Sequence, residues 1–383
     1  MYFSFMPSLL HMSSVRVVSR LLLDRDIGIL LDEDMSIPSG INRYERRRHE
    51  VWKAIEKKAR RKLRPLQTRL SIKLVKFLRP MYMEVIAWLR DHEFEATPKI
   101  FNFLLKHFIQ WKTDGTIDRK KTAMKMIQSR RFHYRYRFIL ACNYLLIDDI
   151  FVLWNRVKRS KRKKLYRTGT NAAVRFWVHL LKAMDGASKA ELIQKYFSAS
   201  SEDRAGPSKP LISRYFKPKR IKDTDFPLRL SSYFPFIPQE YRQEYFTKIN
   251  YALLNKTDFS LCLYEMHEQE RLQLLEAKPA FALKRCLEWP FQSLFVELAQ
   301  QVVDHMKLID YELMLRHIIV FYILSDLDYY ELFSDFWDVI PENYRNRIME
   351  VERSFFPFKA VLNFDGVNPS KTIIKTLKKY YYS

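Results

Sequence analysis

The stretch Trp289-Pro-Phe-Gln-Ser-Leu-Phe-Val-Glu-Leu-Ala-Gln-Gln-Val-Val-Asp-His-Met306 carries the clearest periodic pattern in the chain. Its large apolar residues recur at spacings of three and four, at Phe291, Leu294, Phe295, Leu298, Val302 and Met306. Such spacing places apolar side chains on one face of an α-helix, and a proline at its beginning suits a helix start. The stretch therefore predicts a helix that begins near Trp289 and buries one side.

Similar patterns occur along the whole chain. One follows Thr97-Pro98, where threonine can cap a helix and proline can occupy its first position, and another follows Asn171. Ile237-Pro-Gln-Glu-Tyr-Arg242 recurs as Ile340-Pro-Glu-Asn-Tyr-Arg345, 103 residues later. Only seven glycines are present, which disfavours folds built on glycine turns. The sequence predicts an all-α fold of stacked helix pairs, arranged as an irregular α-solenoid-like array.

Four segments carry a resemblance to a known family. They are Arg137-Phe-Ile-Leu-Ala-Cys-Asn-Tyr144 with Trp154, Cys286-Leu-Glu-Trp-Pro-Phe-Gln-Ser293, Leu327-Asp-Tyr-Tyr-Glu-Leu-Phe333 with Trp337, and Val361-Leu-Asn-Phe-Asp365. In these segments the chain resembles an uncharacterised arachnid family of α-helical repeat proteins, over residues 95–366. The resemblance implies a mostly helical fold of repeated helix pairs. It implies no activity, cofactor or site residue.

The positive charge is confined to one part of the chain. The net charge of the 383 residues is +24. Residues 1–50 hold seven cations and seven acids, residues 51–200 hold 35 Lys and Arg against 11 acids, and residues 201–383 hold 25 of each. A uniform composition would not produce this distribution, so we expect two regions with different surfaces.

Composition also suggests how the chain is divided. Ser, Pro and Lys are enriched around residues 198–219, which predicts a linker. The first residues contain Arg16 and Arg20 but no acid before Asp24, a pattern that also allows a weak organelle transit peptide. The predicted parts are a poorly ordered N-terminal segment (1–40), a basic helical region (41–197), a linker (198–222), a helical repeat region (223–366) and a C-terminal tail (367–383).

Motifs that carry familiar chemistry are missing from the sequence. It contains no GxGxxG, P-loop, HExxH, Glu-x-x-His or GxSxG pattern. We therefore predict no catalytic residue, no metal ligand and no cofactor, and we expect that the protein is not an enzyme. Cys142, Cys262 and Cys286 are far apart in apolar surroundings, which favours a reducing, intracellular compartment, cytoplasmic or nuclear. The longest apolar run, Ile318–Leu324, is much shorter than the ~20 residues that span a bilayer, so no transmembrane segment is predicted.

Asn155-Arg-Val-Lys-Arg-Ser-Lys-Arg-Lys-Lys-Leu-Tyr-Arg167 contains eight cations and no acid. Such a run can bind a polyanion, act as a nuclear-import signal, or form a solvated surface. The segment Arg131-Phe-His-Tyr-Arg-Tyr-Arg-Phe138 alternates cations with aromatic rings. In an extended conformation it would suit single-stranded nucleic acid, but the following residues favour a helix whose rings are partly buried. The candidate polyanion-binding residues are Arg156, Lys158, Arg159, Lys161, Arg162, Lys163, Lys164, Arg167, Arg131, Arg135 and Arg137.

Two functions remain open from the sequence. The first is a non-enzymatic helical-repeat scaffold that interacts with a protein partner through its aromatic helices. The alternative is nucleic-acid binding through the basic block 51–167, where further basic stretches such as Lys57–Arg64 occur. The oligomeric state and the identity of a partner cannot be read from the sequence.

Overall fold

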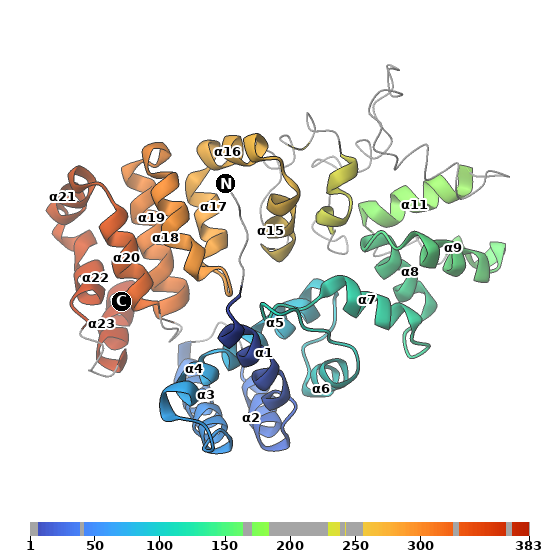
Figure 1. The fold of residues 1–383 in the computed structure, drawn as a ribbon, viewed down its shortest axis with the longest axis horizontal. Coiled ribbons are helices and arrows are strands. Elements are labelled where there is room, and N and C mark those ends of the chain that lie inside the picture. Colours follow the sequence, from blue (N-terminus) through green and yellow to red (C-terminus); the bar gives the residue numbers. More distant parts are fainter. Residues whose placement is uncertain are drawn as a thin grey trace. The chain divides into compact units, whose positions relative to one another are not determined.

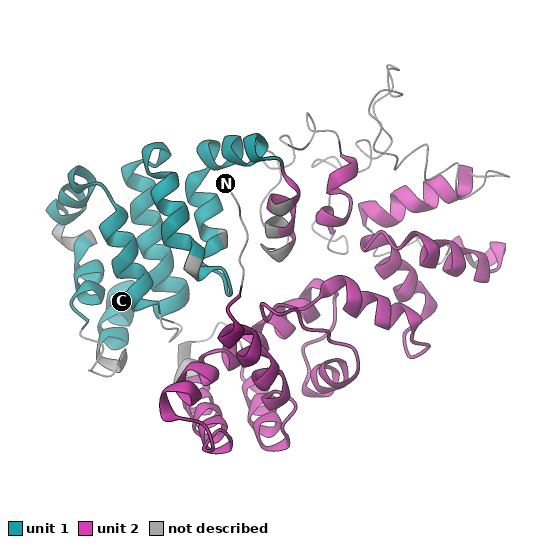
Figure 2. Cartoon of the chain, viewed as in Figure 1, with its two compact units in different colours: residues 1–5, 267–383 teal, residues 6–266 magenta. Residues whose placement is uncertain are grey.

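The computed structural model describes residues 7–38, 42–163, 171–183, 229–237, 242, 256–324, 329–364 and 370–382. Within these ranges the regular elements are helices, apart from one isolated antiparallel β-bridge between Trp111 and Ile117 (Figure 1). The prediction of an all-α fold is therefore confirmed. The chain divides into two compact units, unit 2 (Met6–Met266) and unit 1 (Met1–Phe5 and His267–Ser383), shown in Figure 2.

Unit 2 consists of helices joined by short connections in its described part. Its α-helices are α1 (Leu9–Leu21), α2 (Arg25–Ser36), α3 (Asn42–Lys62), α4 (Thr68–Lys76), α5 (Leu78–Asp91), α6 (Pro98–His107), α7 (Arg119–Gln128), α8 (Tyr134–Asn143), α9 (Ile147–Arg156), α11 (Ala172–Ala183) and α15 (Lys256–Glu265). Its 3-10 helices are η1 (Arg159–Lys161), η4 (Leu230–Ser232) and η5 (Phe234–Phe236). As predicted, the side chain of Thr97 caps α6 by accepting a hydrogen bond from the N–H of Ile100.

The N-terminal region differs from the expectation of a poorly ordered segment over residues 1–40. Residues 9–21 and 25–36 form α1 and α2. Ser8 caps α1, and the carboxylate of Asp24 caps α2 by accepting two backbone N–H groups. Val15 and Val18 on α1 are buried, because α1 packs against α4 and α5. Local caps and the packing of apolar side chains therefore order this segment.

Further helix pairs complete unit 2. Helix α2 packs against α3 and α6, and α8 packs against α7, α9 and α11. Trp88 and Trp177 are fully buried among these helices. The indole N–H of Trp177 donates a hydrogen bond to the hydroxyl of Tyr233 at 2.9 Å, and this hydroxyl donates to the carbonyl of Cys142. Buried aromatic side chains with satisfied polar groups therefore connect η4 and η5 to the α8–α11 region.

A buried ionic network joins distant segments of unit 2. Nη1 of Arg119 lies 2.8 Å from Oδ2 of Asp91, and its Nη2 lies 3.2 Å from Oε1 of Glu84. Nη2 of Arg229 lies 3.1 Å from the same oxygen of Asp91, while its Nη1 lies 4.0 Å from Oδ1 of Asp258. Both guanidinium groups are almost fully buried. The network therefore ties α15 and the segment that begins at Arg229 to α5 and α7.

Burial controls the charge of this network. It raises the pKa of Glu84 and of Asp258, and the neighbouring arginines only partly oppose this shift. Asp258 also accepts hydrogen bonds from the N–H groups of Leu230 and Ser231. Burial opposes the charged form of Arg229, yet nearby Tyr144, Asp91 and Asp258 raise the pKa of its guanidinium overall. Arg229 thus remains charged, whereas burial disfavours the charged forms of Glu84 and Asp258.

Unit 1 is a stack of helices. These are α16 (Glu268–Ala277), α17 (Pro279–Cys286), α18 (Gln292–Gln301), η6 (Val303–His305), α19 (Leu308–Ile318), the π-helix η7 (Ile319–Ile323), α20 (Tyr330–Val339), α21 (Glu342–Glu350), α22 (Glu352–Leu362) and α23 (Ser370–Tyr382). Helices α17, α18, α19 and α20 each pack against the α-helix whose number is two higher. This regular pattern is that of stacked helix pairs, consistent with the predicted α-solenoid-like array.

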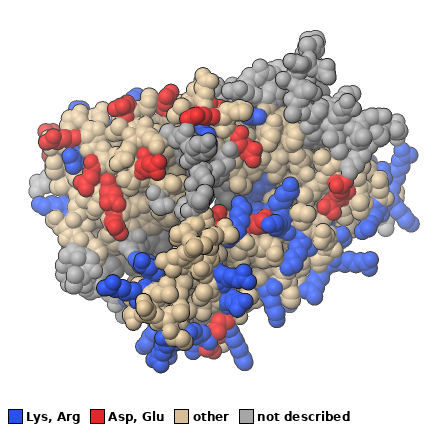
Figure 3. Space-filling model, viewed as in Figure 1, with Lys and Arg blue, Asp and Glu red and all other residues tan. Residues whose placement is uncertain are grey.

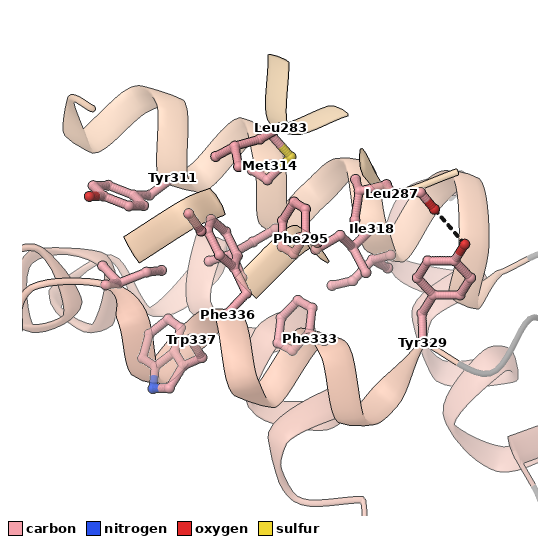
Figure 4. Packing of buried hydrophobic residues seen from close by; sticks show 14 of the residues in the cluster. Leu283, Leu287, Phe295, Tyr311, Met314, Ile318, Tyr329, Phe333, Phe336 and Trp337 are labelled. Carbon is pink, nitrogen blue, oxygen red and sulfur yellow. Dashed lines mark hydrogen bonds between the residues drawn. The ribbon is translucent and has the colours of Figure 1, made fainter. Parts of the chain in front are cut away.

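One contiguous core fills unit 1 (Figure 4). The rings of Phe295 and Phe336 meet edge to face, with centroids 5.1 Å apart. The hydroxyl of Tyr329 donates a hydrogen bond to the carbonyl of Leu287 at 2.6 Å, so its buried polar group is satisfied. Burying one large apolar side chain such as that of Phe295 stabilises the fold by about 1.5–3 kcal/mol. Four residues of the stripe predicted between Phe291 and Met306 belong to this core: Phe295 and Leu298 on α18, and Val302 and Met306 on either side of η6.

The described residues cover only part of the predicted division of the chain. The linker 198–222 lies outside the described residues. The boundary between the compact units falls between Met266 and His267, just before α16. Composition placed the boundary earlier, because the Ser- and Pro-rich stretch is the strongest local signal, whereas compactness depends on which helices pack together.

Candidate polyanion-binding surface

The basic run of residues 155–167 does not form one continuous helix in its described part. Helix α9 ends at Arg156, and the short η1 follows. Like charges on neighbouring turns repel each other, which opposes continuation of the helix. The side chains of Arg156, Lys158, Arg159 and Lys163 are exposed. The side chain of Lys161, and Lys164 and Arg167 altogether, lie outside the part that the structure describes.

Arg162 differs from its neighbours in the run. Its guanidinium carbon lies 4.6 Å from the ring centroid of Trp154. Its Nε donates a hydrogen bond to the carbonyl of Val157 at 3.2 Å. A cation over an indole at a partly exposed site gains about 0.5–1 kcal/mol. Arg162 therefore has a structural role at the end of α9.

The alternating segment 131–138 is helical for most of its length. Helix α8 begins at Tyr134, so the extended conformation is excluded and the helical interpretation is confirmed. The ring of Phe132 packs against Phe108, and the ring of Tyr136 packs against Phe94, with centroids about 5 Å apart in each pair. These rings belong to an aromatic cluster, so they are not displayed together as a surface on which bases could stack.

The three arginines of this segment have different surroundings. Arg131 is exposed, with its guanidinium carbon 5.6 Å from the ring centroid of Phe103. Arg135 and Arg137 are half-buried, and Nε of Arg137 donates a hydrogen bond to a main-chain carbonyl at the end of α7. Burial and the nearby charge of Arg156 lower the pKa of Arg137. The structure thus brings the two predicted basic segments together at Arg137 and Arg156.

A second basic surface lies between α3 and α4. A groove there encloses about 690 Å³. Its lining consists of Lys53, Glu56, Lys57, Arg60, Arg61, Arg64, Leu66, Thr68, Ser71 and Ile72. Four of its five cations follow one face of α3 at spacings of three and four, namely Lys53, Lys57, Arg60 and Arg61. Arg64 lies two residues beyond the end of this helix. We call this feature the α3–α4 groove.

The opposite charges of α2 neutralise a different face of α3. Nζ of Lys62 lies 2.7 Å from a carboxylate oxygen of Asp24 and 3.0 Å from one of Asp26, and Nζ of Lys58 lies 3.3 Å from Asp26. Hydrogen bonds from Lys62 and Lys58 lower the pKa of Asp26, and those to Asp24 and Asp26 raise the pKa of Lys62. The protein therefore neutralises this face with its own acids.

Fewer ion pairs neutralise the cations on the groove face of α3 than those on the face that contacts α2. Arg60 pairs with Glu56 at 3.4 Å. Within the described part of the chain, Lys57, Arg61 and Arg64 form no ion pair. Like charges three or four residues apart destabilise a helix by about 0.2–0.5 kcal/mol per pair. A bound polyanion would remove this repulsion, so the groove is suited to phosphate-bearing ligands.

Sequence reasoning identified Lys57–Arg64 as a basic stretch but did not include it among the candidate residues. The missed signal is the segment 57–83, which contains ten Lys and Arg and no acid. Figure 3 shows Lys and Arg gathered mainly over unit 2 on the face displayed, while Asp and Glu are more frequent over unit 1. The division of charge expected from the sequence is therefore visible on the surface.

Other reactive groups are buried or dispersed. Burial raises the pKa of Cys142 well above its ordinary value and that of Cys286 to about 12. The thiolate is the reactive form of cysteine, so these two side chains act as parts of the core. Among the described residues, no group of three or more His, Cys, Asp and Glu is placed to hold a metal ion. Over the same residues, no helix is both long and apolar enough to cross a bilayer.

Comparisons with protein-family models, curated proteins and solved structures found no match. The resemblance to the arachnid helical-repeat family therefore stays a prediction. Any functional conclusion about the α3–α4 groove rests on its chemistry and geometry.

Proposed function

We propose that the protein is a non-enzymatic helical-repeat module that binds nucleic acid by its phosphate backbone, with the α3–α4 groove as the main contact. The observation that carries this proposal is the groove face of α3. Five cations line the groove, four of them on α3, and Lys57, Arg61 and Arg64 have no acid partner among the described residues. Lysine and arginine side chains that follow one helix face are suited to a polyanion with regularly spaced charges.

The groove also supplies neutral groups that suit a phosphate backbone. The side chain of Thr68 is exposed beside the cations, and its hydroxyl can donate a hydrogen bond to a phosphate oxygen. No aromatic side chain lines this groove. Contacts here would therefore fix the position of the backbone without selecting a base sequence. We expect binding that is strong at low salt and largely independent of sequence.

The test is fluorescence anisotropy of the full chain with labelled single-stranded RNA and duplex DNA at increasing salt. If each groove cation neutralises one phosphate, log Kd for the single strand should rise with log salt with a slope of about 3–4. In the variant Lys57→Gln/Arg61→Gln/Arg64→Gln we expect weaker binding and a slope that is smaller by about 2.

A matched control removes the same charge elsewhere in unit 2. Lys99, Lys106 and Lys125 are exposed on α6 and α7, outside the groove. The variant Lys99→Gln/Lys106→Gln/Lys125→Gln should retain most of the affinity. Equal losses in the two variants would show that net charge alone drives binding and would contradict a role for the groove. Absence of binding at about 0.15 M salt, near physiological ionic strength, would reject the proposed function.

The basic run 156–164 has a separate role under this proposal, as a nuclear-import signal. Arg156, Lys158 and Lys163 are exposed, as an import receptor requires. A fusion of the chain to a fluorescent protein should accumulate in the nucleus, and neutralising these three residues should abolish accumulation. Unchanged distribution of the variant would argue against this role.

A second candidate function is interaction with a protein partner through unit 1. The observation that favours it is an apolar stripe on α19 and η7. Ile309 and Leu313 lie four residues apart on α19, and Phe321 follows in η7; their side chains are 54%, 47% and 60% exposed. Exposed apolar side chains in a row mark interaction surfaces more often than isolated ones do.

Site-specific photo-crosslinking in cells tests the second candidate. A crosslinker placed at Leu313 should capture one defined protein, and the substitution Phe321→Ser should prevent this capture. A crosslinker at Glu297, an exposed residue of α18, provides the control. The same products from both positions would argue against a specific partner.

A further inference from the structure

A second groove of unit 2 lies between α1 and the hairpin formed by residues 110–118. It encloses about 510 Å³, within the ~300–1,000 Å³ that is usual for small-ligand sites. Its lining consists of Met12, Ser13, Val15, Arg16, Ser19, Arg20, Trp111, Lys112 and Thr113. The lining thus combines cations, an indole ring and hydroxyl groups, and it contains no acid. We call this feature the Trp111 groove.

Hydrogen bonds shape the hairpin before any ligand binds. The N–H of Lys112 donates to the carbonyl of Thr116 at 2.8 Å, beside the β-bridge that pairs Trp111 with Ile117. The turn contains Gly115 in a left-handed conformation, with φ of 87°, which glycine adopts without strain. Trp111 is therefore held on a defined backbone.

The only acid at the hairpin turn is used inside the hairpin. The carboxylate of Asp114 accepts hydrogen bonds from the N–H and the hydroxyl of Thr116, at 2.8 and 2.7 Å. It therefore does not neutralise the cations that line the groove. The groove walls are also fixed to each other, because Nε2 of His11 on α1 lies 2.9 Å from the carbonyl oxygen of Asp114. A preorganised site loses less conformational entropy when it binds.

The functional groups of the groove have few partners of their own. Arg16 and Arg20 lie one turn apart on α1, and both are exposed. In the described part of the structure neither they nor Lys112 form an ion pair, and the ring of Trp111 stacks on no other ring. Trp111 is half-buried and forms part of the groove wall. An indole face next to uncompensated cations is suited to a base and its phosphate.

We propose that the Trp111 groove is a nucleotide subsite for single-stranded nucleic acid. One base stacks on Trp111, while Arg16, Arg20 and Lys112 contact the adjoining phosphates. This inference rests on the proposed function. It adds a preference for single strands, which the α3–α4 groove does not supply because no aromatic side chain lines it. Bases in a duplex are already stacked and paired, so the subsite favours the single strand.

The test distinguishes recognition of bases from recognition of phosphates. Anisotropy is measured with labelled oligothymidylate and with an abasic deoxyribose phosphate strand of the same length, which carries the charges but no bases. Wild-type protein should bind the intact strand more tightly. Trp111→Ala should weaken that binding about 5- to 150-fold, the range measured for loss of one stacked base, and leave the abasic strand almost unchanged. Trp111→Phe retains an aromatic face and should restore most of the affinity.

Each outcome has a distinct consequence. Phe356→Ala removes an exposed ring from α22 of unit 1 and should leave the affinities for both strands unchanged, which controls for general loss of aromatic surface. If wild-type and Trp111→Ala protein discriminate equally between intact and abasic strands, the subsite is refuted, while binding of both strands supports the proposed function. If neither strand binds but phosphatidylserine vesicles do, both proposals are overturned. Circular dichroism melting of Trp111→Ala verifies that the variant is folded.

Discussion

Replacement of Arg229 by methionine should destabilise unit 2 strongly. The substitution keeps much of the side-chain volume but removes the charge that lies 3.1 Å from Asp91 and 4.0 Å from Asp258. Removal of one partner from a buried ion pair typically costs about 3–5 kcal/mol. Asp91 retains Arg119 at 2.8 Å, and Asp258 retains hydrogen bonds from the backbone. We therefore expect a loss near the lower limit, about 3 kcal/mol.

Urea denaturation of the full chain provides the measurement, combined with hydrogen exchange of peptides from α5 and α16. Protection should fall in α5, which belongs to unit 2, while α16 of unit 1 serves as the internal reference. The control Arg90→Met removes an exposed cation from the same α5 and should change the free energy of unfolding by less than about 0.5 kcal/mol. Adding Asp258→Asn to the Arg229 variant should recover part of the lost stability, because the double variant no longer buries an unpaired carboxylate at position 258. Similar stabilities of Arg229→Met and Arg90→Met would refute the reasoning.

Four further predictions concern individual residues. Phe295→Ala should lower the free energy of unfolding of unit 1 by about 3–5 kcal/mol, measured by urea denaturation, because Phe295 is fully buried against Phe336. Thr97→Ala should cost about 1 kcal/mol through loss of the α6 cap, whereas Thr97→Ser should be nearly neutral in the same assay. Burial raises the pKa of Glu84 in the folded state, so its favourable contribution is complete below about pH 4.5 and is lost as the pH rises through the raised pKa. Stability of Glu84→Gln should therefore fall less steeply than that of the wild type as the pH rises from 4.5 towards neutrality, and parallel profiles would contradict this account. The buried thiols of Cys142 and Cys286 should react with an aromatic disulfide reagent only after unfolding, and rapid reaction of the folded chain would show that they are accessible.

The helices of this protein could be predicted because their signals are local. Apolar spacing between Phe291 and Met306 marked the buried face of α18, although this helix ends at Gln301 and the last two residues of the stripe, Val302 and Met306, flank η6. The Thr97-Pro98 cap gave the start of α6 correctly. The missed helices α1 and α2 also had local signals, namely caps at Ser8 and Asp24. The sequence therefore carried the local information for these two helices.

The candidate site could be predicted only in part. The excess of Lys and Arg in residues 51–200 correctly indicated where positive surface lies. Sequence alone gave no means of separating Lys58 and Lys62, which pair with α2, from Lys57 and Arg61, which line the α3–α4 groove. All four belong to one basic stretch of α3, and their surroundings differ only because α2 packs on one side of that helix.

By itself the sequence determined the helical class of the fold, the positions of several helices and the asymmetry of charge between its halves. These properties depend on hydrogen bonds and side-chain spacings within a few residues, which the order of amino acids specifies directly. Tertiary structure decided which charges are neutralised, which rings are buried and which grooves remain open. Arg229 contacts Asp91 across 138 residues of sequence. Trp111 lines the same groove as Arg16, which lies far from it in the sequence, so only the packing of distant segments brings these residues together. Electrostatic energy depends on separation in space and on burial, and neither is written in the local pattern.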